Sequence, residues 1–159
     1  MKVYCPNCFY PNEANQKICQ KCGGLIEWEE KSYEDKLIKA LSHKDYQIVL
    51  RAAEILSNFK SDRTKKALTS IIFKSKDPYI QAAAVNSLAN ISYDKTLKTF
   101  RKIALSGSLP ARLKAIEAMG KKSSLNDIGL LEKLKKDDSE TVRTKAKEAI
   151  INIKKRHDL

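Results

Sequence analysis

Apolar residues recur every third or fourth position along most of this chain, and the same pattern returns four times. The four segments begin at residues 45, 77, 108 and 139, so successive copies are 31 or 32 positions apart. Within each copy the aligned apolar residues stand at positions i, i+4 and i+8, which places them on one face of an α-helix. The aligned columns are Ile48, Ile80, Ala111 and Val142; Ala52, Ala84, Ala115 and Ala146; and Leu56, Leu88, Met119 and Ile150. The small alanine column predicts that neighbouring helices approach closely.

A second apolar pattern follows each of the first three segments and predicts a second helix. These helices are marked by Leu68, Ile71 and Ile72, then by Leu97, Phe100, Ile103 and Ala104, and then by Ile128, Leu131 and Leu134. Each unit is a predicted helical hairpin that must stack on its neighbours to bury its apolar face. Residues 33–42 and 139–155 fit half-units at the two ends. We therefore predict a mainly α fold, an α-solenoid of about three hairpins plus capping half-repeats over residues 32–156.

The segments Asp77-Pro78-Tyr79-Ile80 and Ala111-Arg112 resemble HEAT-like repeats, in particular the short subtype named after phycobilisome lyases. Armadillo repeats fit less well, because their units are longer and contain a third helix. Gln81 and Val49 stand where the family usually has Arg, so an Arg-to-Asp ladder between units is expected to be incomplete. The resemblance implies a protein-binding scaffold whose second helices line the concave face. Some relatives bind nucleic acid and a few assist attachment of bilin pigments, but no reactive residue here argues for that last activity.

All four cysteines lie in the first 22 residues, in two Cys-x-x-Cys pairs. Two residues between paired cysteines let a tight turn present both sulfur atoms to one ion, and two such turns complete a tetrahedron around zinc. A disulfide framework would normally spread through a small secreted fold, and a thioredoxin-type site would need one pair beside a βαβ pattern. We predict that Cys5, Cys8, Cys19 and Cys22 bind one Zn²⁺, with free or redox-active thiols as the alternative. Because four thiolates leave no open coordination position, the zinc is expected to be structural.

Residues 1–28 are predicted to form a small N-terminal β zinc ribbon that depends on its metal for folding. Gly23, after the second cysteine turn, is expected to need a positive φ. Short strands are expected at Val3-Tyr4, Lys17-Ile18 and Leu25-Ile26. The stretch from Cys5 to Gly23 resembles a small prokaryotic zinc-ribbon family, although Phe9 stands where that family usually has Gly. The resemblance implies a structural zinc module that serves in binding.

The charge of the chain is unevenly distributed. Lys and Arg number 31 against 19 Asp and Glu, a formal net charge of +12, and the helical part carries the excess. A basic surface can attract acidic proteins or nucleic acid, and it also keeps a protein soluble. Lys greatly outnumbers Arg and aromatics do not interleave with the cations, which weakens the case for nucleic-acid recognition. The residues expected to line a partner-binding groove come from successive predicted second helices: Lys66, Lys98, Arg101, Lys102 and Lys133.

The remaining polar residues do not form a pattern typical of an active site. The two histidines, His43 and His157, lack a neighbouring Cys, Asp or Glu at a spacing that suggests a catalytic pair, and we expect both at the surface. A polar column on the first helices is expected to face solvent or, alternatively, to bind a basic partner; it consists of Glu54, Asn86, Glu117 and Glu148. No glycine-rich phosphate loop is present apart from the knuckle glycines.

The sequence therefore favours a non-catalytic adaptor or scaffold without a small-molecule substrate. It is expected to bind a protein partner within a larger assembly through the helical stack, with the ribbon as a second binding module. The alternative is a factor associated with RNA, DNA or the ribosome that uses the basic helical face. Because no apolar stretch is long enough for a membrane span and the first residues lack a secretory signal, we expect a cytoplasmic protein.

Overall fold

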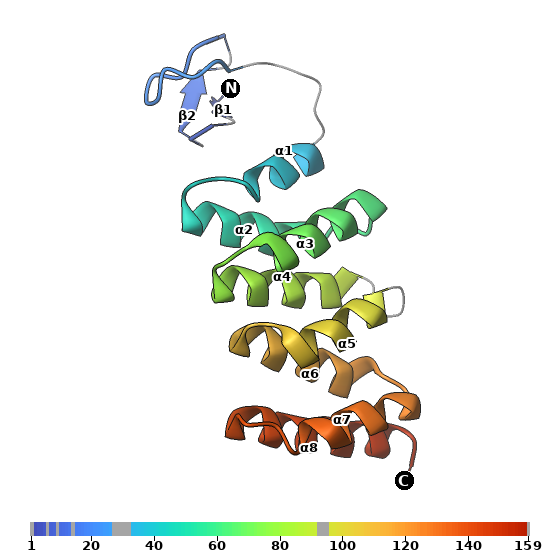
Figure 1. The fold of residues 1–159 in the computed structure, drawn as a ribbon. Coiled ribbons are helices and arrows are strands. Elements are labelled where there is room, and N and C mark those ends of the chain that lie inside the picture. Colours follow the sequence, from blue (N-terminus) through green and yellow to red (C-terminus); the bar gives the residue numbers. More distant parts are fainter. Residues whose placement is uncertain are drawn as a thin grey trace.

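The computed structural model describes residues 2–5, 7–8, 10–13, 15–26, 33–91 and 96–158. The described residues form a mainly helical stack, with a small cysteine-rich unit beyond α1 at one end (Figure 1). The helices are α1 (Tyr33–Ala40), α2 (Tyr46–Leu56), α3 (Asp62–Lys74), α4 (Pro78–Ile91), α5 (Leu97–Ser106), α6 (Leu109–Lys122), η2 (Leu125–Asp127, a 3-10 helix), α7 (Ile128–Leu134) and α8 (Glu140–Arg156). The predicted boundary between ribbon and repeats, near Glu27–Lys31, and the predicted contributions of Phe9 and Ala14 lie outside the described residues.

The even-numbered helices begin one residue after the four positions predicted from the repeat. Asp45 and Asp77 accept hydrogen bonds from backbone N–H groups in the first turns of α2 and α4. Ser61 caps α3 in the same way. A side-chain oxygen at this position satisfies an N–H group that has no partner inside the helix. The sequence pattern therefore located the helix starts correctly.

The pairing of the helices differs from the predicted hairpins. Each odd-numbered helix packs on the even-numbered helix that follows it, which gives four sequential pairs, α1–α2, α3–α4, α5–α6 and α7–α8. The prediction paired each even helix with the odd helix after it and left half-repeats at both ends. The predicted pairing is wrong. In an alternating series, each helix could pair with the helix before it or the helix after it, and only the packing distinguishes the two arrangements.

The four pairs stack through one layer. We call α2, α4, α6 and α8 the even layer, and α1, α3, α5 and α7 the odd layer. Successive helices of the even layer are in direct contact, whereas α3, α5 and α7 have little contact with one another. The stack is therefore held together mainly along the even layer. That the odd helices line a concave face stays a prediction from the resemblance.

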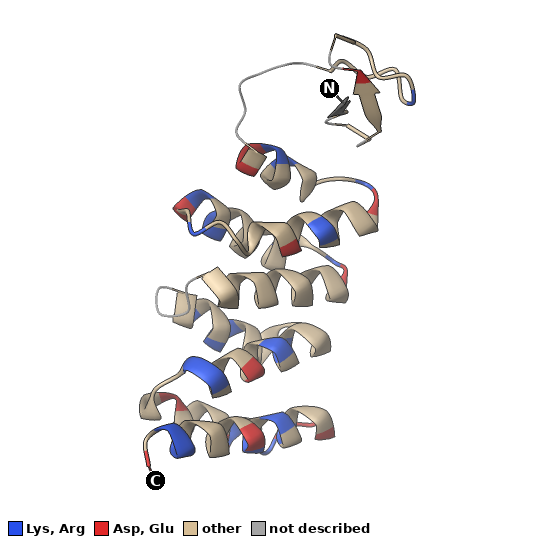
Figure 2. Ribbon diagram, turned by 180° about the vertical axis from the view of Figure 1, so that it is seen from behind, with Lys and Arg blue, Asp and Glu red and all other residues tan. Residues whose placement is uncertain are grey.

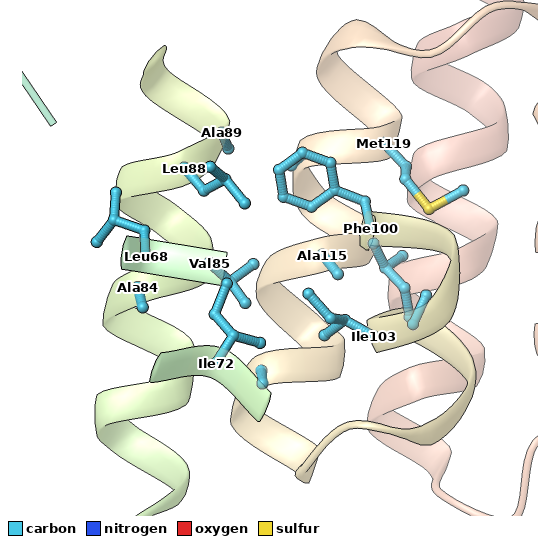
Figure 3. Close-up of a cluster of buried hydrophobic side chains, with 14 of the residues drawn as sticks. Leu68, Ile72, Ala84, Val85, Leu88, Ala89, Phe100, Ile103, Ala115 and Met119 are labelled. Atoms are coloured by element: carbon cyan, nitrogen blue, oxygen red, sulfur yellow. The ribbon is translucent and has the colours of Figure 1, made fainter. Parts of the chain in front are cut away.

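The alanine column explains the close contact within the even layer. Ala52, Ala84, Ala115 and Ala146 are all buried, as predicted. Larger side chains from both layers fill the space between the helices (Figure 3). Phe100 of α5 is completely buried and lies between Met119 of its own hairpin and Leu88 of the preceding hairpin. One continuous core therefore runs the length of the stack.

Side chains at one aligned position of the even layer hold the ends of the odd helices. The bonds are Gln81 Nε2 to Ser75 O (2.7 Å), Arg112 Nε to Ala104 O (3.0 Å) and Arg143 Nη1 to Asp137 O (2.8 Å). They satisfy carbonyl groups at or just beyond the ends of these helices. Arg112 also pairs with the Asp137 carboxylate in the next hairpin. Gln81 keeps the carbonyl bond but, being neutral, cannot form the ion pair, and Val49 cannot donate at all, so the ladder is incomplete as predicted.

The cysteine-rich unit contains only a minimal sheet among its described residues. Strand β1 (Lys2–Tyr4) pairs antiparallel with β2 (Pro11–Glu13), and Val3 lies opposite Asn12. The predicted strand at Val3-Tyr4 is present as part of β1. The other two predicted strands reduce to a single antiparallel bridge between Ile18 and Leu25. With so little sheet, the cysteine cluster must supply much of the cohesion of this unit.

Candidate metal centre and binding surface

The four cysteine sulfur atoms converge on one point. All four Sγ atoms lie within 4.8 Å of one another. Cys5 Sγ is 3.7 Å from Cys22 Sγ, and Cys8 Sγ is 3.5 Å from Cys19 Sγ. Four ligands at a Zn–S bond length of about 2.3 Å would be separated by roughly 3.8 Å in a tetrahedron, so the cluster fits one such ion. The separations are too long for disulfide bonds, and all four cysteines are free thiols.

The backbone around the second knuckle brings the sulfurs together. Gly23 has φ of +67°, the left-handed conformation predicted for it, and its N–H donates to Cys19 O. Cys19 N in turn donates to Gly24 O (2.8 Å). A Cβ atom at Gly24 would lie 3.3 Å from Cys22 Sγ, so a larger residue there would crowd the cluster. These two glycines therefore serve the metal site, as expected, and not a phosphate loop.

Backbone and amide N–H groups point at the sulfur atoms. The N–H groups of Asn7 and Lys21 lie 3.4 Å from the sulfurs of Cys5 and Cys19 respectively. Asn12, which is buried, donates from Nδ2 to the Cys19 sulfur (3.7 Å) and accepts from the Gln20 N–H (3.0 Å). Such donors stabilise thiolates and orient them. Sequence reasoning missed the role of Asn12, whose signal was an amide side chain on a strand beside the cysteines.

The thiol pKa values differ across the cluster. Burial raises the pKa of Cys8 to about 12. At Cys19 burial also acts to raise the pKa, but N–H donors including those of Cys22 and Lys21 outweigh it and lower the value to about 6. The Gly24 N–H is the largest cause that lowers the pKa of Cys22. Because a metal binds thiolates, the N–H donors favour the ligand form of Cys19 and Cys22, whereas burial opposes it at Cys8.

One histidine joins the metal unit to the helical stack. His43, in the turn between α1 and α2, has its Nε2 atom 2.5 Å from Asn7 O in the first knuckle. Its Nδ1 accepts from the Asp45 N–H (2.9 Å), so the Nε2 position of the neutral ring carries the proton and donates to the carbonyl. The sequence predicted an ordinary surface residue at His43, but the structure shows that this side chain links the two units.

The five basic residues predicted to line a groove all lie on the odd layer, on α3, α5 and α7. Lys66, Lys98, Lys102 and Lys133 are exposed. Arg101 instead donates from Nε to the buried carboxylate of Asp127 (2.6 Å), which ties α5 to the start of the fourth hairpin. Lys and Arg recur along the height of the stack (Figure 2). The odd layer thus presents its lysines, while Arg101 supports the fold.

The polar column of the even layer is largely charge-paired where it is acidic. Glu117 lies between Lys114 (3.2 Å) and Lys121 (2.6 Å), and the hydrogen bond from Lys121 is the main cause that lowers the Glu117 pKa. Glu148 pairs with Lys145 (2.7 Å). A hollow of about 180 Å³ between α6 and α8 is lined by both ion pairs. This surface is therefore close to neutral there, which disfavours its role as a stripe for a basic partner.

Comparison with known proteins identifies the helical part. A family model described as HEAT repeats matches residues 66–151, more than half of the chain. A search of curated proteins found no match. Among the helices that the structure describes, none has both the length and the apolar character that a membrane span requires.

Proposed function

We propose that this chain, which belongs to the HEAT-repeat family, is a non-catalytic adaptor that binds an acidic protein partner through its odd layer. HEAT repeats typically mediate protein binding. In this proposal the cysteine unit holds one structural zinc ion and acts as a second binding module. Four sulfur ligands would fill every position of a tetrahedral ion, which leaves none for an activated water.

The observation that carries the proposal is the set of exposed lysines on the odd layer. Lys66, Lys98, Lys102 and Lys133 come from three successive hairpins. A Lys ammonium is a flexible point charge, suited to carboxylates along an acidic segment. The arginines of this layer are engaged within the chain: Arg63 pairs with Glu34 and Asp35, and Arg101 with Asp127. Bidentate recognition of phosphates or bases therefore lacks its usual residue here.

The cysteine unit offers an exposed apolar pair that supports its role as a second contact. Ile18 and Leu25 lie opposite each other across the bridge, and both are more than half exposed. Paired residues of a bridge project on the same side. A metal shared by both knuckles would join this pair to the first knuckle, whose Asn7 carbonyl contacts His43 at the start of the stack.

Affinity purification of the full chain, with and without nuclease treatment, tests the proposal. A protein partner that survives nuclease and dissociates when Lys98→Glu and Lys102→Glu are combined supports the adaptor. The matched control is Lys154→Glu with Lys155→Glu, which changes the same charge on exposed residues of α8. Recovery that collapses with nuclease favours the nucleic-acid alternative. In that case affinity for RNA or DNA should fall with salt, with a log–log slope of roughly −0.7 to −0.9 per phosphate contact.

A further inference from the structure

Exposed apolar side chains gather at the turns inside two successive hairpins. Phe73 and Tyr79 flank the turn between α3 and α4, and Leu105 and Leu109 flank the turn between α5 and α6. Their exposed fractions run from 45% for Leu109 to 63% for Tyr79, so the core explains little of their presence. Apolar residues that cluster on a surface mark an interaction site more often than scattered ones do.

A contact between Lys102 and Phe73 links the two turns. Phe73 and Leu105 each stand five residues after a fully buried residue of the odd layer, Leu68 and Phe100, so they occupy equivalent positions in neighbouring hairpins. Lys102 bridges them: its Nζ lies 4.8 Å from the centroid of the Phe73 ring, and it precedes Leu105 by three residues on α5. Residues three apart on a helix share a face. We call Phe73, Tyr79, Lys102, Leu105 and Leu109 the turn strip.

The charge around the turn strip is positive. Lys74 and Lys76 are exposed in and beside the first turn, and Lys98 is exposed on α5. The nearby carboxylate of Asp77 is occupied in capping α4, where it accepts from the N–H groups of Tyr79 and Ile80. The turn strip thus combines apolar surface with positive charge. A polypeptide that carries both carboxylates and apolar side chains would be complementary to it.

We propose that the turn strip binds an acidic, amphipathic segment of a partner protein, with apolar side chains of that segment packed against Phe73 and Leu105. This inference rests on the proposed adaptor function and specifies both the contact surface and the partner. A nucleic acid fits the strip less well, because Lys102 already covers the Phe73 ring and leucine side chains cannot stack bases as aromatic platforms do. Apolar anchors surrounded by complementary charge are the usual composition of a protein-binding site.

A substitution that adds positive charge while removing an apolar side chain distinguishes apolar docking from purely electrostatic attraction of an acidic peptide. Leu105 is 54% exposed near the end of α5, so a Lys side chain at this position can extend into solvent without entering the core. The probe is a fluorescent synthetic peptide in which Asp and Glu alternate with Leu and Phe, titrated against the full zinc-loaded chain. Leu105→Lys should weaken binding at least about tenfold although it adds positive charge. Phe73→Ala should weaken it similarly. Ile151→Lys, on an equally exposed apolar residue of α8, should leave affinity unchanged or slightly raised.

Four results would overturn the inference. These are no binding of the peptide, binding unchanged or tightened by Leu105→Lys, equal binding of a peptide with Ser in place of Leu and Phe, and tighter binding of polyuridine or of phosphatidylserine vesicles than of the peptide. Failure here is distinct from failure of the adaptor proposal. A nuclease-resistant partner that is lost in the Lys98 and Lys102 variant but retained in Leu105→Lys would leave the adaptor in place and remove the turn strip.

Discussion

The backbone of Gly120 on α6 passes so close to Ala149 on α8 that a Cβ atom at position 120 would lie 2.8 Å from the Ala149 Cα atom. Both residues are buried, and the obstructing atoms belong to a helix backbone that cannot turn aside as a flexible side chain could. Contact between the third and fourth hairpins therefore depends on the absence of a side chain at this position.

Replacing Gly120 with Ala should separate α6 from α8 and destabilise the stack by about 1–3 kcal/mol, the usual cost of overpacking. Urea denaturation followed by circular dichroism measures the change. Gly129→Ala is the matched control, because a Cβ at Gly129 on α7 meets nothing within 4 Å. That variant should be neutral or more stable, since Ala is the better helix former. Equal stability of Gly120→Ala and the wild type would show that the two helices are not held this closely.

The ion pair between Arg112 and Asp137 should make stability depend on pH. The hydrogen bond from Arg112 is the main cause that holds the Asp137 pKa below its ordinary value. A lowered folded pKa means that the contribution is present above the unfolded pKa, about 4, and is lost as pH falls through the folded pKa. Asp137→Asn should therefore cost about 1–3 kcal/mol at pH 7 and progressively less below about pH 4.

Unfolding free energies measured at several pH values check this dependence. Glu148→Gln is the control, because its pair with Lys145 is about half exposed and should contribute little at any pH. A constant difference between Asp137→Asn and wild type from pH 7 to pH 3 would contradict the assignment.

Metal removal should unfold the cysteine unit and spare the stack. The buried cluster of Cys5, Cys19 and Ile26 is separate from the core of the helices. We expect one zinc per chain by elemental analysis, and a chelator should release it while most of the helical dichroism remains. Nuclear magnetic resonance would locate the loss of structure within residues 2–26. A protein that is isolated without metal and with two disulfides would refute this prediction.

Asn12 should support the metal site without being a ligand. Its side chain contacts the Cys19 sulfur and the backbone of Tyr10 and Gln20, so it fixes the second knuckle against β2. Asn12→Ala should lower zinc affinity about 10–100-fold, measured by chelator competition. Asn15→Ala, at an exposed position in the same unit, should have little effect. Equal affinities of the two variants would remove Asn12 from the site.

Sequence periodicity was sufficient to predict the buried face of the even layer. Ala84 and Ala115 are completely buried because a column of small residues at one helix face allows only a close neighbour. The phase of the hairpins could not be obtained this way, since it depends on which helix faces pack together. Burial of Phe100 is compatible with either pairing and so gave no guidance.

The metal ligands could be predicted from the sequence, but the contacts that position the cysteine unit could not. The spacing of the cysteines alone restricts Cys5 and Cys22 to a common ion, because two tight turns can meet in few ways. The contact of His43 with Asn7 depends on how two distant segments lie against each other. The exposure of Phe73 under Lys102 likewise depends on packing between hairpins, which is why the sequence suggested that no aromatic residue accompanies the cations.

The continuous contacts of the even layer also determine how the molecule deforms. Because the helices of the even layer are in continuous contact, the stack resists extension along that layer and deforms more easily along the odd layer. Bending would change the distances between α3, α5 and α7 with little loss of core contact, because these helices touch one another only slightly. The odd layer, which presents the four exposed lysines, is consequently the more deformable side. A bound segment that spans several hairpins on this side would set the curvature of the whole stack.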